Sequence, residues 1–218
     1  MLGHFRLLAL VIATSVAATA ASATTFIFDS DPFEGSTALT TPGRQIVGGE
    51  PFISFNIATD QFIFVETAFD AGGTVSFAND VVGNLPVSGL NVIVLQSLDN
   101  DADATTPFGA GNAANLLAGQ ITSDGGGFFI YFNSGLDTPR LVYSTDLSDP
   151  TADLAILARM TNLAGNSAAL AGFSAANFDI RAAAVPEPAT WAMMLLGFGV
   201  VGLALRRRRP STLERRLA

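Results

Sequence analysis

The chain is predicted to be all-β, with an antiparallel β-sandwich or jelly-roll-like ectodomain between an N-terminal signal helix and a C-terminal transmembrane helix. Two observations predict the ectodomain fold, and a third excludes one way of stabilising it. Short runs rich in Phe, Ile and Val alternate with polar residues, which is the period of a half-buried strand. These runs recur about every ten residues, separated by Gly, Asn, Asp or Pro, as in sandwich folds. The chain has no Cys, so apolar packing and not disulfide bonds must hold the domain together.

The expected strands follow one another along the whole of this central part. Segments 52–57 and 61–66 are separated only by Ala58-Thr59-Asp60, which favours a hairpin or a short connection. The remaining strands are expected at 25–28, 73–77, 90–95, 128–132, 140–144 and 178–180. Most of the 17 Phe of the chain should lie in the core, because aromatic side chains on a pleated face usually do.

Two segments have ambiguous patterns. Residues 153–160 combine good helix formers with the alternation of Leu154, Ile156 and Ala158, and we favour a strand because segment 143–149 resembles a hairpin partner. Residues 110–119 are small and polar and contain Gly and Asn. They are expected to form a loop or a single helical turn.

The residue composition excludes most familiar active sites. The chain has no Cys and no Lys, and its single His is His4. Thiolate nucleophiles, zinc–thiolate sites and Schiff-base lysines are therefore excluded, and so is Ser-His-Asp catalysis if the N-terminus is removed. The central part carries 17 acidic residues and four Arg, a net charge of −13. Such a surface should not bind nucleic acid.

Residues 1–23 are predicted to be a secretory signal peptide. A weakly basic start precedes an apolar run over 7–18, which is too short to span a membrane. Ala21-Ser22-Ala23 then forms a small-x-small cleavage site, with Ala21 and Ala23 as its two small residues. Residues 24–181 are long enough to form one acidic ectodomain with a single core.

A linker over residues 182–190 follows the ectodomain and contains Pro186, Glu187 and Pro188. The two prolines oppose helix formation and hold the residue before each in an extended conformation. An extended and exposed stretch is what the groove of a protease requires. The linker is therefore a candidate processing site.

An uncharged segment, residues 191–205, comes next and opens with Trp191. We expect a short transmembrane helix here, with the Trp at the membrane interface. The basic tail 206–218 begins with a stop signal of four consecutive arginines, which favours a cytoplasmic C-terminus. These arginines are Arg206, Arg207, Arg208 and Arg209.

The order of these features resembles the PEP-CTERM sorting signal, in the PEPxxWA form found in Gram-negative bacteria that make exopolysaccharide. The likeness covers roughly the last tenth of the chain, and several ordered features coincide in it. It implies that an exosortase, a polytopic inner-membrane cysteine protease, recognises the Pro-Glu-Pro motif and cuts near it. It also implies an exported protein that is first a precursor anchored in the inner membrane and later lies at the cell surface or outside the cell.

One acidic loop is a weak candidate for calcium binding. Asp99, Asp101 and Asp103 alternate along the chain, so that their carboxylates could supply oxygen ligands to Ca²⁺. Ala104 and Ala110 stand where an EF-type loop has its Gly and its bidentate Glu. A solvated acidic loop is the alternative interpretation, and no other cofactor is expected.

The sequence thus predicts a non-enzymatic surface or extracellular-matrix protein, associated with exopolysaccharide or a biofilm. One alternative is a secreted β-sandwich carbohydrate-active enzyme that uses paired carboxylates, with Glu34, Glu50, Glu66 and Asp70 among the candidates. Another alternative is a calcium-stabilised adhesin. The number of acids makes some carboxylate pairs inevitable, so pairing alone does not favour an enzyme.

Overall fold

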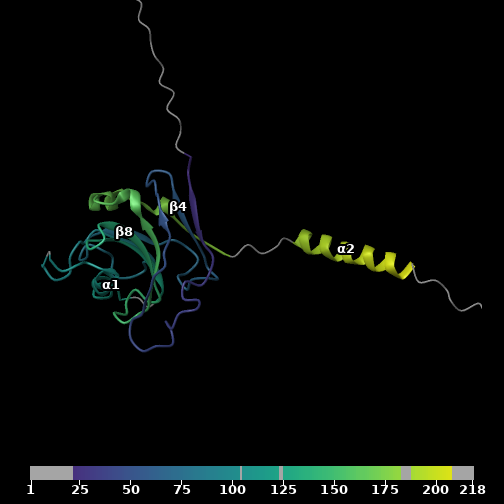
Figure 1. Cartoon of the computed structure of the whole chain (residues 1–218), viewed down its shortest axis with the longest axis horizontal. Helices are drawn as coiled ribbons and strands as arrows, with labels where there is room; N and C mark the ends of the chain where they lie inside the picture. Colours follow the sequence, from purple (N-terminus) through teal and green to yellow (C-terminus); the bar gives the residue numbers. More distant parts are fainter. Residues whose placement is uncertain (1–21, 104, 123–124, 183–187, 208–218) are drawn as a thin grey trace, which may run out of the picture. The chain divides into compact units, whose positions relative to one another are not determined.

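The computed structural model describes residues 22–103, 105–122, 125–182 and 188–207. The chain divides into two compact units, Met1–Arg181 and Ala182–Ala218. The described part of the first unit contains ten strands and the helix α1, and that of the second contains the helix α2 (Figure 1). The prediction of an all-β ectodomain is confirmed.

Two sheets build the ectodomain. The smaller sheet has the order β1-β4-β10, and the larger, seven-stranded sheet has the order β2-β9-β8-β7-β6-β5, with β3 also paired to β9. The strands of the smaller sheet are β1 (Thr25–Phe28), β4 (Gln61–Val65) and β10 (Phe178–Arg181). Those of the larger sheet are β2 (Ile46–Val47), β3 (Phe52–Ile53), β5 (Phe77–Asp80), β6 (Val92–Leu95), β7 (Gly127–Asn133), β8 (Thr138–Ser144) and β9 (Leu154–Met160).

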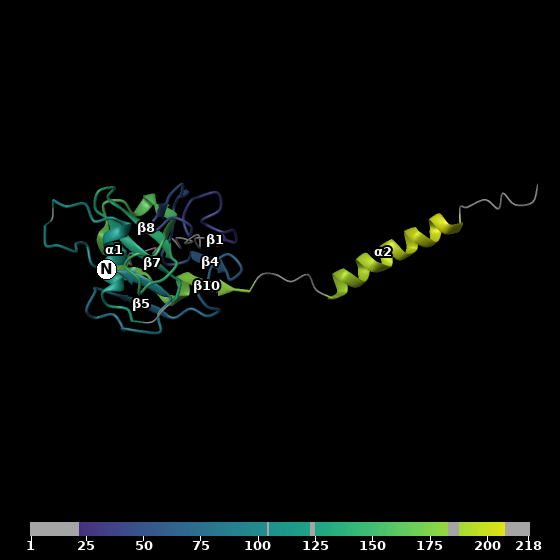
Figure 2. The same ribbon diagram turned by 90° about the horizontal axis from the view of Figure 1, so that it is seen from below.

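The larger sheet is the middle of three layers. The smaller sheet covers one of its faces and α1 covers the other, as both views show (Figures 1 and 2). Alternate residues of β7 therefore enter two different cores: Phe128 and Ile130 face the smaller sheet, whereas Phe129 and Tyr131 face α1. This double burial explains why every residue of β7 is buried.

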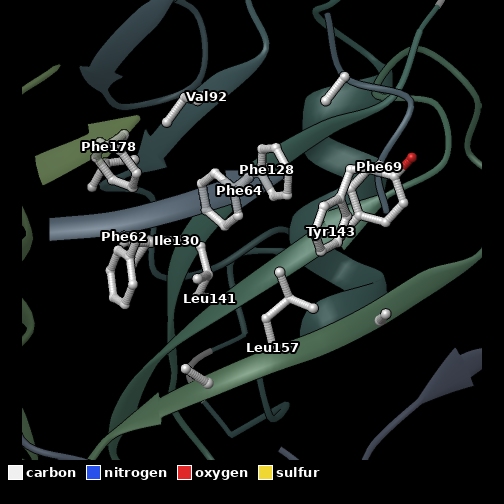
Figure 3. Packing of buried hydrophobic residues seen from close by; sticks show 14 of the residues in the cluster. Phe62, Phe64, Phe69, Val92, Phe128, Ile130, Leu141, Tyr143, Leu157 and Phe178 are labelled. Atoms are coloured by element: carbon white, nitrogen blue, oxygen red, sulfur yellow. The ribbon is translucent and has the colours of Figure 1, made fainter. Parts of the chain in front are cut away.

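Stacked phenylalanines join the two sheets. The rings of Phe64 on β4 and Phe128 on β7 lie nearly parallel, with centroids 3.6 Å apart (Figure 3). Phe69 packs edge-on against both Phe128 and Tyr143, at centroid distances of 5.1 and 5.0 Å. The expectation that Phe side chains form the core is confirmed at these positions.

The predicted antiparallel arrangement is wrong for most of the strand pairs. Six of the eight described pairings are parallel, and only β7–β8 and β8–β9 are antiparallel. Of the two alternatives for segments 52–57 and 61–66, the hairpin is wrong, because β3 pairs with β9 and β4 pairs with β1 and β10. The short connection is what the structure shows. The N–H groups of Thr59 and Asp60 donate to the carbonyl of Asn56, and the chain passes from one sheet to the other.

Residues 110–119, expected as a loop or one turn, form the helix α1 (Ala110–Ala118). Its buried residues Ala110, Ala113, Ala114 and Leu117 follow helical spacing, and the small side chains allow close packing on the sheet.

The segment 153–160, whose pattern was ambiguous, contains the strand β9, which is antiparallel to β8 as predicted. Between β9 and β10 the chain forms three short 3₁₀ helices, η1 (Thr161–Leu163), η2 (Ser167–Gly172) and η3 (Ala175–Asn177).

Candidate functional site

The C-terminal unit contains the predicted sorting segment. Its described residues form α2 (Pro188–Arg207), which begins at the second proline of the motif and includes Trp191. The helix is therefore longer than the predicted 191–205 and continues into the arginine cluster. Pro186, Glu187, Arg208 and Arg209 lie outside the described residues.

The side chains of α2 are exposed over residues 192–206. Nine large apolar side chains are among them: Met193, Met194, Leu195, Leu196, Phe198, Val200, Val201, Leu203 and Leu205. A helix that is apolar on all sides normally lies in a protein core or a membrane. Within the described ranges, however, no helix reaches both the length and the hydropathy that a membrane crossing requires. The predicted transmembrane helix is thus not confirmed.

The strand β10 leads directly to the sorting segment. It ends at Arg181, and only residues 182–185 separate it from Pro186. Four residues span at most about 14 Å when fully extended. A protease that cuts at Pro-Glu-Pro must therefore work close to the edge of the folded domain.

The two predicted processing sites lie at opposite ends of the smaller sheet. The strands β1 and β10 both run parallel to β4, with Thr25 beside Gln61 and Arg181 beside Val65. Ala23, at the predicted signal cleavage site, is exposed just before the start of β1, and Ala21 lies outside the described residues. The sorting segment leaves from the other end, beyond the last residue of β10.

The structure does not bring Asp99, Asp101 and Asp103 together as metal ligands. Their Oδ1 atoms accept hydrogen bonds within the loop, from the N–H of Asp101 (3.1 Å), of Asp103 (3.0 Å) and of Thr105 (3.0 Å). Each carboxylate thus stabilises its own turn. Among the residues that the structure describes, no three acidic groups are placed to hold a metal ion. The calcium site expected from the sequence therefore stays a prediction, because spacing alone does not show where the carboxylates point.

A second group of polar side chains crosses the larger sheet. Neighbouring strands place Phe52, Arg159, Arg140 and Tyr131 in one row, on the face that α1 covers in part. The guanidinium of Arg159 lies 4.7 Å from the centre of the Phe52 ring, and this ring is 67% exposed. We call these four residues the cross-strand row.

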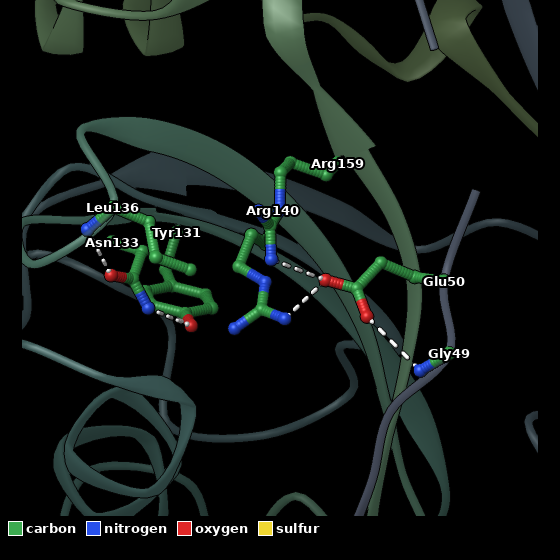
Figure 4. Close-up of polar contacts among 7 residues, drawn as sticks. All are labelled: Gly49, Glu50, Tyr131, Asn133, Leu136, Arg140 and Arg159. Carbon is green, nitrogen blue, oxygen red and sulfur yellow. Dashed lines mark hydrogen bonds and ion pairs between the residues drawn. The ribbon is translucent and has the colours of Figure 1, made fainter. Parts of the chain in front are cut away.

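Glu50 holds the two arginines of the cross-strand row together. Its Oε1 accepts hydrogen bonds from Arg140 and from Arg159 (3.1 Å for the latter), and its Oε2 accepts one from Gly49 N–H at 3.2 Å (Figure 4). The carboxylate is only 6% exposed. Burial alone would raise the pKa of Glu50, but the hydrogen bonds from Arg140 and Arg159 lower the pKa below its ordinary value. The ionised form of Glu50 is therefore favoured by its surroundings.

Some polar atoms in and beside the cross-strand row have no hydrogen-bond partner. Among the described residues, this holds for the buried Nε atoms of Arg140 and Arg159, and for the buried Oγ1 of Thr138 at the start of β8. Like charges directly opposite each other on adjacent strands are destabilising. One carboxylate shared by two guanidinium groups offsets this repulsion, so the arrangement is a structural brace between β3, β8 and β9.

The other predicted carboxylates lie apart from this brace. Glu66 and Asp70 line a shallow hollow of about 350 Å³ together with Asp31. Asp70 also borders a neighbouring hollow of about 390 Å³, lined by Gly126 and polar loop residues. The N–H of Asp70 donates to the hydroxyl of Tyr143 at 3.1 Å. Carboxylates do gather here, but the sequence alone did not distinguish them from other surface acids.

Sequence reasoning missed the acid that is most important for the terminal strands. Asp60, in the predicted hairpin connection, is 5% exposed and binds the backbone N–H of Thr24 at 2.9 Å. The sequence offered one signal for this contact, an acidic residue directly before an apolar strand. Its partner lies 36 residues earlier, and no local pattern identifies such a pair.

The described structure thus combines a β-rich domain with an apolar C-terminal helix that reaches the arginine cluster. In the family comparison, residues 184–209 match the family described as the PEP-CTERM protein-sorting motif. The chain therefore carries this motif, which marks an exported protein that an exosortase sorts. Comparisons with curated proteins and with solved structures found no match.

Proposed function

We propose that the chain is the precursor of a non-enzymatic surface or extracellular-matrix protein. A signal peptide directs export, residues 188–207 hold the precursor at the inner membrane, and an exosortase cuts near Pro186-Glu187-Pro188. The ectodomain is then released or attached in an exopolysaccharide layer or biofilm, where it acts as a matrix component or weak binding module.

The position of the sorting motif carries this proposal. The motif begins at residue 184, and the ectodomain ends as a compact unit at Arg181. The ectodomain unit therefore ends just before the matched motif starts. A cut in this linker removes the C-terminal unit and breaks no strand pairing of the ectodomain.

The charge distribution supports a solvated matrix role. Each of the four ectodomain arginines is already bound by protein groups: Arg44 by backbone carbonyls and Asn115, Arg140 and Arg159 by Glu50, and Arg181 by Asp179. Of the acidic residues that the structure describes, only Glu50 and Asp179 form such ion pairs. A surface with this excess of negative charge stays soluble and repels anionic surfaces.

The test is the intact mass and membrane fractionation of the protein from its native host, with and without the exosortase gene. The expected mature species lacks the first 23 residues and everything from about Pro186 onward, and it is absent from the exosortase-free strain. A variant in which Pro186, Glu187 and Pro188 are all Ala should remain uncut in the membrane fraction. Identical masses in both strains would overturn the proposal.

A further inference from the structure

Asp60 is an acid buried at the point where all three strands of the smaller sheet begin. Its Oδ1 accepts hydrogen bonds from Thr24 N–H (2.9 Å) and from the Thr59 hydroxyl (3.1 Å), and its Oδ2 accepts one from Asn56 N–H (2.8 Å). The side chain of Asn177, directly before β10, donates to the Asp60 carbonyl at 3.0 Å. None of the ion pairs among the described residues includes Asp60.

One of the three donors to this carboxylate is the Thr24 nitrogen, at the predicted signal cleavage site. Hydrolysis of the Ala23–Thr24 peptide bond adds OH from water to the Ala23 carbonyl and H to the Thr24 nitrogen. The released amine has an ordinary pKa of about 7.7–8.0 and therefore takes up a proton at neutral pH. A neutral N–H with one hydrogen becomes an ammonium group with three hydrogens and a positive charge.

We propose that signal-peptide cleavage after Ala23 creates an ion pair between the new α-ammonium of Thr24 and the buried carboxylate of Asp60. This pair locks β1 onto β4 in the mature protein. The surrounding geometry exists already, since the Thr24 carbonyl accepts a hydrogen bond from Gln61 N–H at 3.0 Å and the register continues from Thr25 beside Gln61. Export thereby strengthens the first strand of the domain at the moment when the signal peptide is lost.

The charged residues described near Asp60 do not compete with the proposed ion pair. On β10, the strand on the other side of β4, Asp179 and Arg181 are bound to each other. The residues that contact Asp60 from the preceding turn and from the start of β10, Asn56, Thr59 and Asn177, are uncharged. An ammonium group beside a carboxylate has a raised pKa, so its contribution to stability is present below about pH 7.7 and is lost as the pH rises through the folded value.

The state of the Thr24 amine can be tested selectively, because the chain contains no Lys. After cleavage, the α-amine of Thr24 is the only primary amine in the protein. An acylating reagent specific for amines, such as an N-hydroxysuccinimide ester of acetic acid, therefore reports on this one group. The protein used is the processed form purified from exporting cells, with its N-terminus established by intact mass.

The expected rate of acylation is at least about tenfold lower in the native protein than in urea, because one unit of pKa elevation removes about nine-tenths of the free amine. Asp60→Asn should bring the native rate to within about twofold of the rate in urea, whereas Asp179→Asn, on the same sheet, should leave it low. Equal rates in native and unfolded wild-type protein would overturn the proposal without any variant. A mature N-terminus other than Thr24 would also overturn it.

This inference rests on the export step of the proposed function, but not on the sorting step. If the mass shows an N-terminus at Thr24 and an intact C-terminal tail, and the native amine is acylated slowly, the ion pair stands and the exosortase proposal fails. If the tail is cut and the amine reacts freely, the reverse holds. The two failures are therefore distinguishable in one sample.

Discussion

Among single residues, Glu50 has the largest expected effect on stability. Glu50→Gln should lower the free energy of unfolding by about 2–3 kcal/mol, because hydrogen bonds to charged groups contribute about 1.5–3 kcal/mol and two opposed arginines lose their shared counter-ion. Chemical denaturation measures this change. Arg181→Gln is the matched control, since it breaks the more exposed pair with Asp179 and should cost at most about 1 kcal/mol. Equal losses in both variants would show that Glu50 is not a brace.

Acid should weaken the ectodomain through the same residue. The pKa of Glu50 is lower in the folded protein than its ordinary value of 4.5, so the unfolded chain takes up a proton first as the pH falls. The contribution of Glu50 is therefore complete above about pH 4.5 and is lost below it. Melting temperatures between pH 7 and pH 3 should fall less steeply for Glu50→Gln than for the wild type. Parallel curves would contradict this assignment.

At the scale of strands and helices, the sequence predicted the position of elements better than their pairing. The strands β7, β8 and β9 could be predicted because their connections are short and their apolar residues alternate. The direction of β1 against β4 could not, since parallel and antiparallel strands share the same period of two. The helix α1 was missed because Gly111, Asn112 and Asn115 obscured the helical spacing of its buried alanines.

The contact between the two sheets depends on the phenylalanine stack of β4 and β7. Phe64→Ala should lower the free energy of unfolding by about 3–5 kcal/mol, because it leaves a cavity beside a fully buried ring. Phe64→Leu keeps much of the volume and should cost clearly less. Urea denaturation of both variants measures the difference. Similar losses for Leu and Ala would mean that ring stacking, and not filled volume, holds the sheets together.

At the scale of the whole molecule, the sorting segment could be predicted from the sequence because its features follow one another in linear order. Trp191, the apolar run and the arginines needed no knowledge of the fold. The ion pairs of Glu50 and the contact of Asp60 with Thr24 could not be predicted, since they join residues 36 to 109 positions apart. Such contacts depend on the sheet pairing, which local patterns do not determine.

The arginine cluster should decide membrane retention of the precursor. Replacing Arg206, Arg207, Arg208 and Arg209 with Gln should reduce the membrane-bound fraction in an exosortase-free strain, because arginines resist translocation. Replacing Arg215 and Arg216 with Gln is the matched control, since these residues lie beyond the matched motif. Fractionation and immunoblotting measure the outcome. Unchanged retention in the first variant would contradict a stop signal at this position.

The ectodomain should fold without its C-terminal unit, because both buried apolar clusters consist of residues from Phe33 to Ile180. A form that ends at Val185, exported by its own signal peptide so that it begins at Thr24, should melt in one cooperative transition. Its melting temperature should agree with that of the full-length protein in detergent to within about 2–4 °C, the shift that 1 kcal/mol produces in a domain of this size. A broad transition would mean that the C-terminal unit contributes to the core. A single sharp transition would show that the ectodomain keeps its fold without the tail.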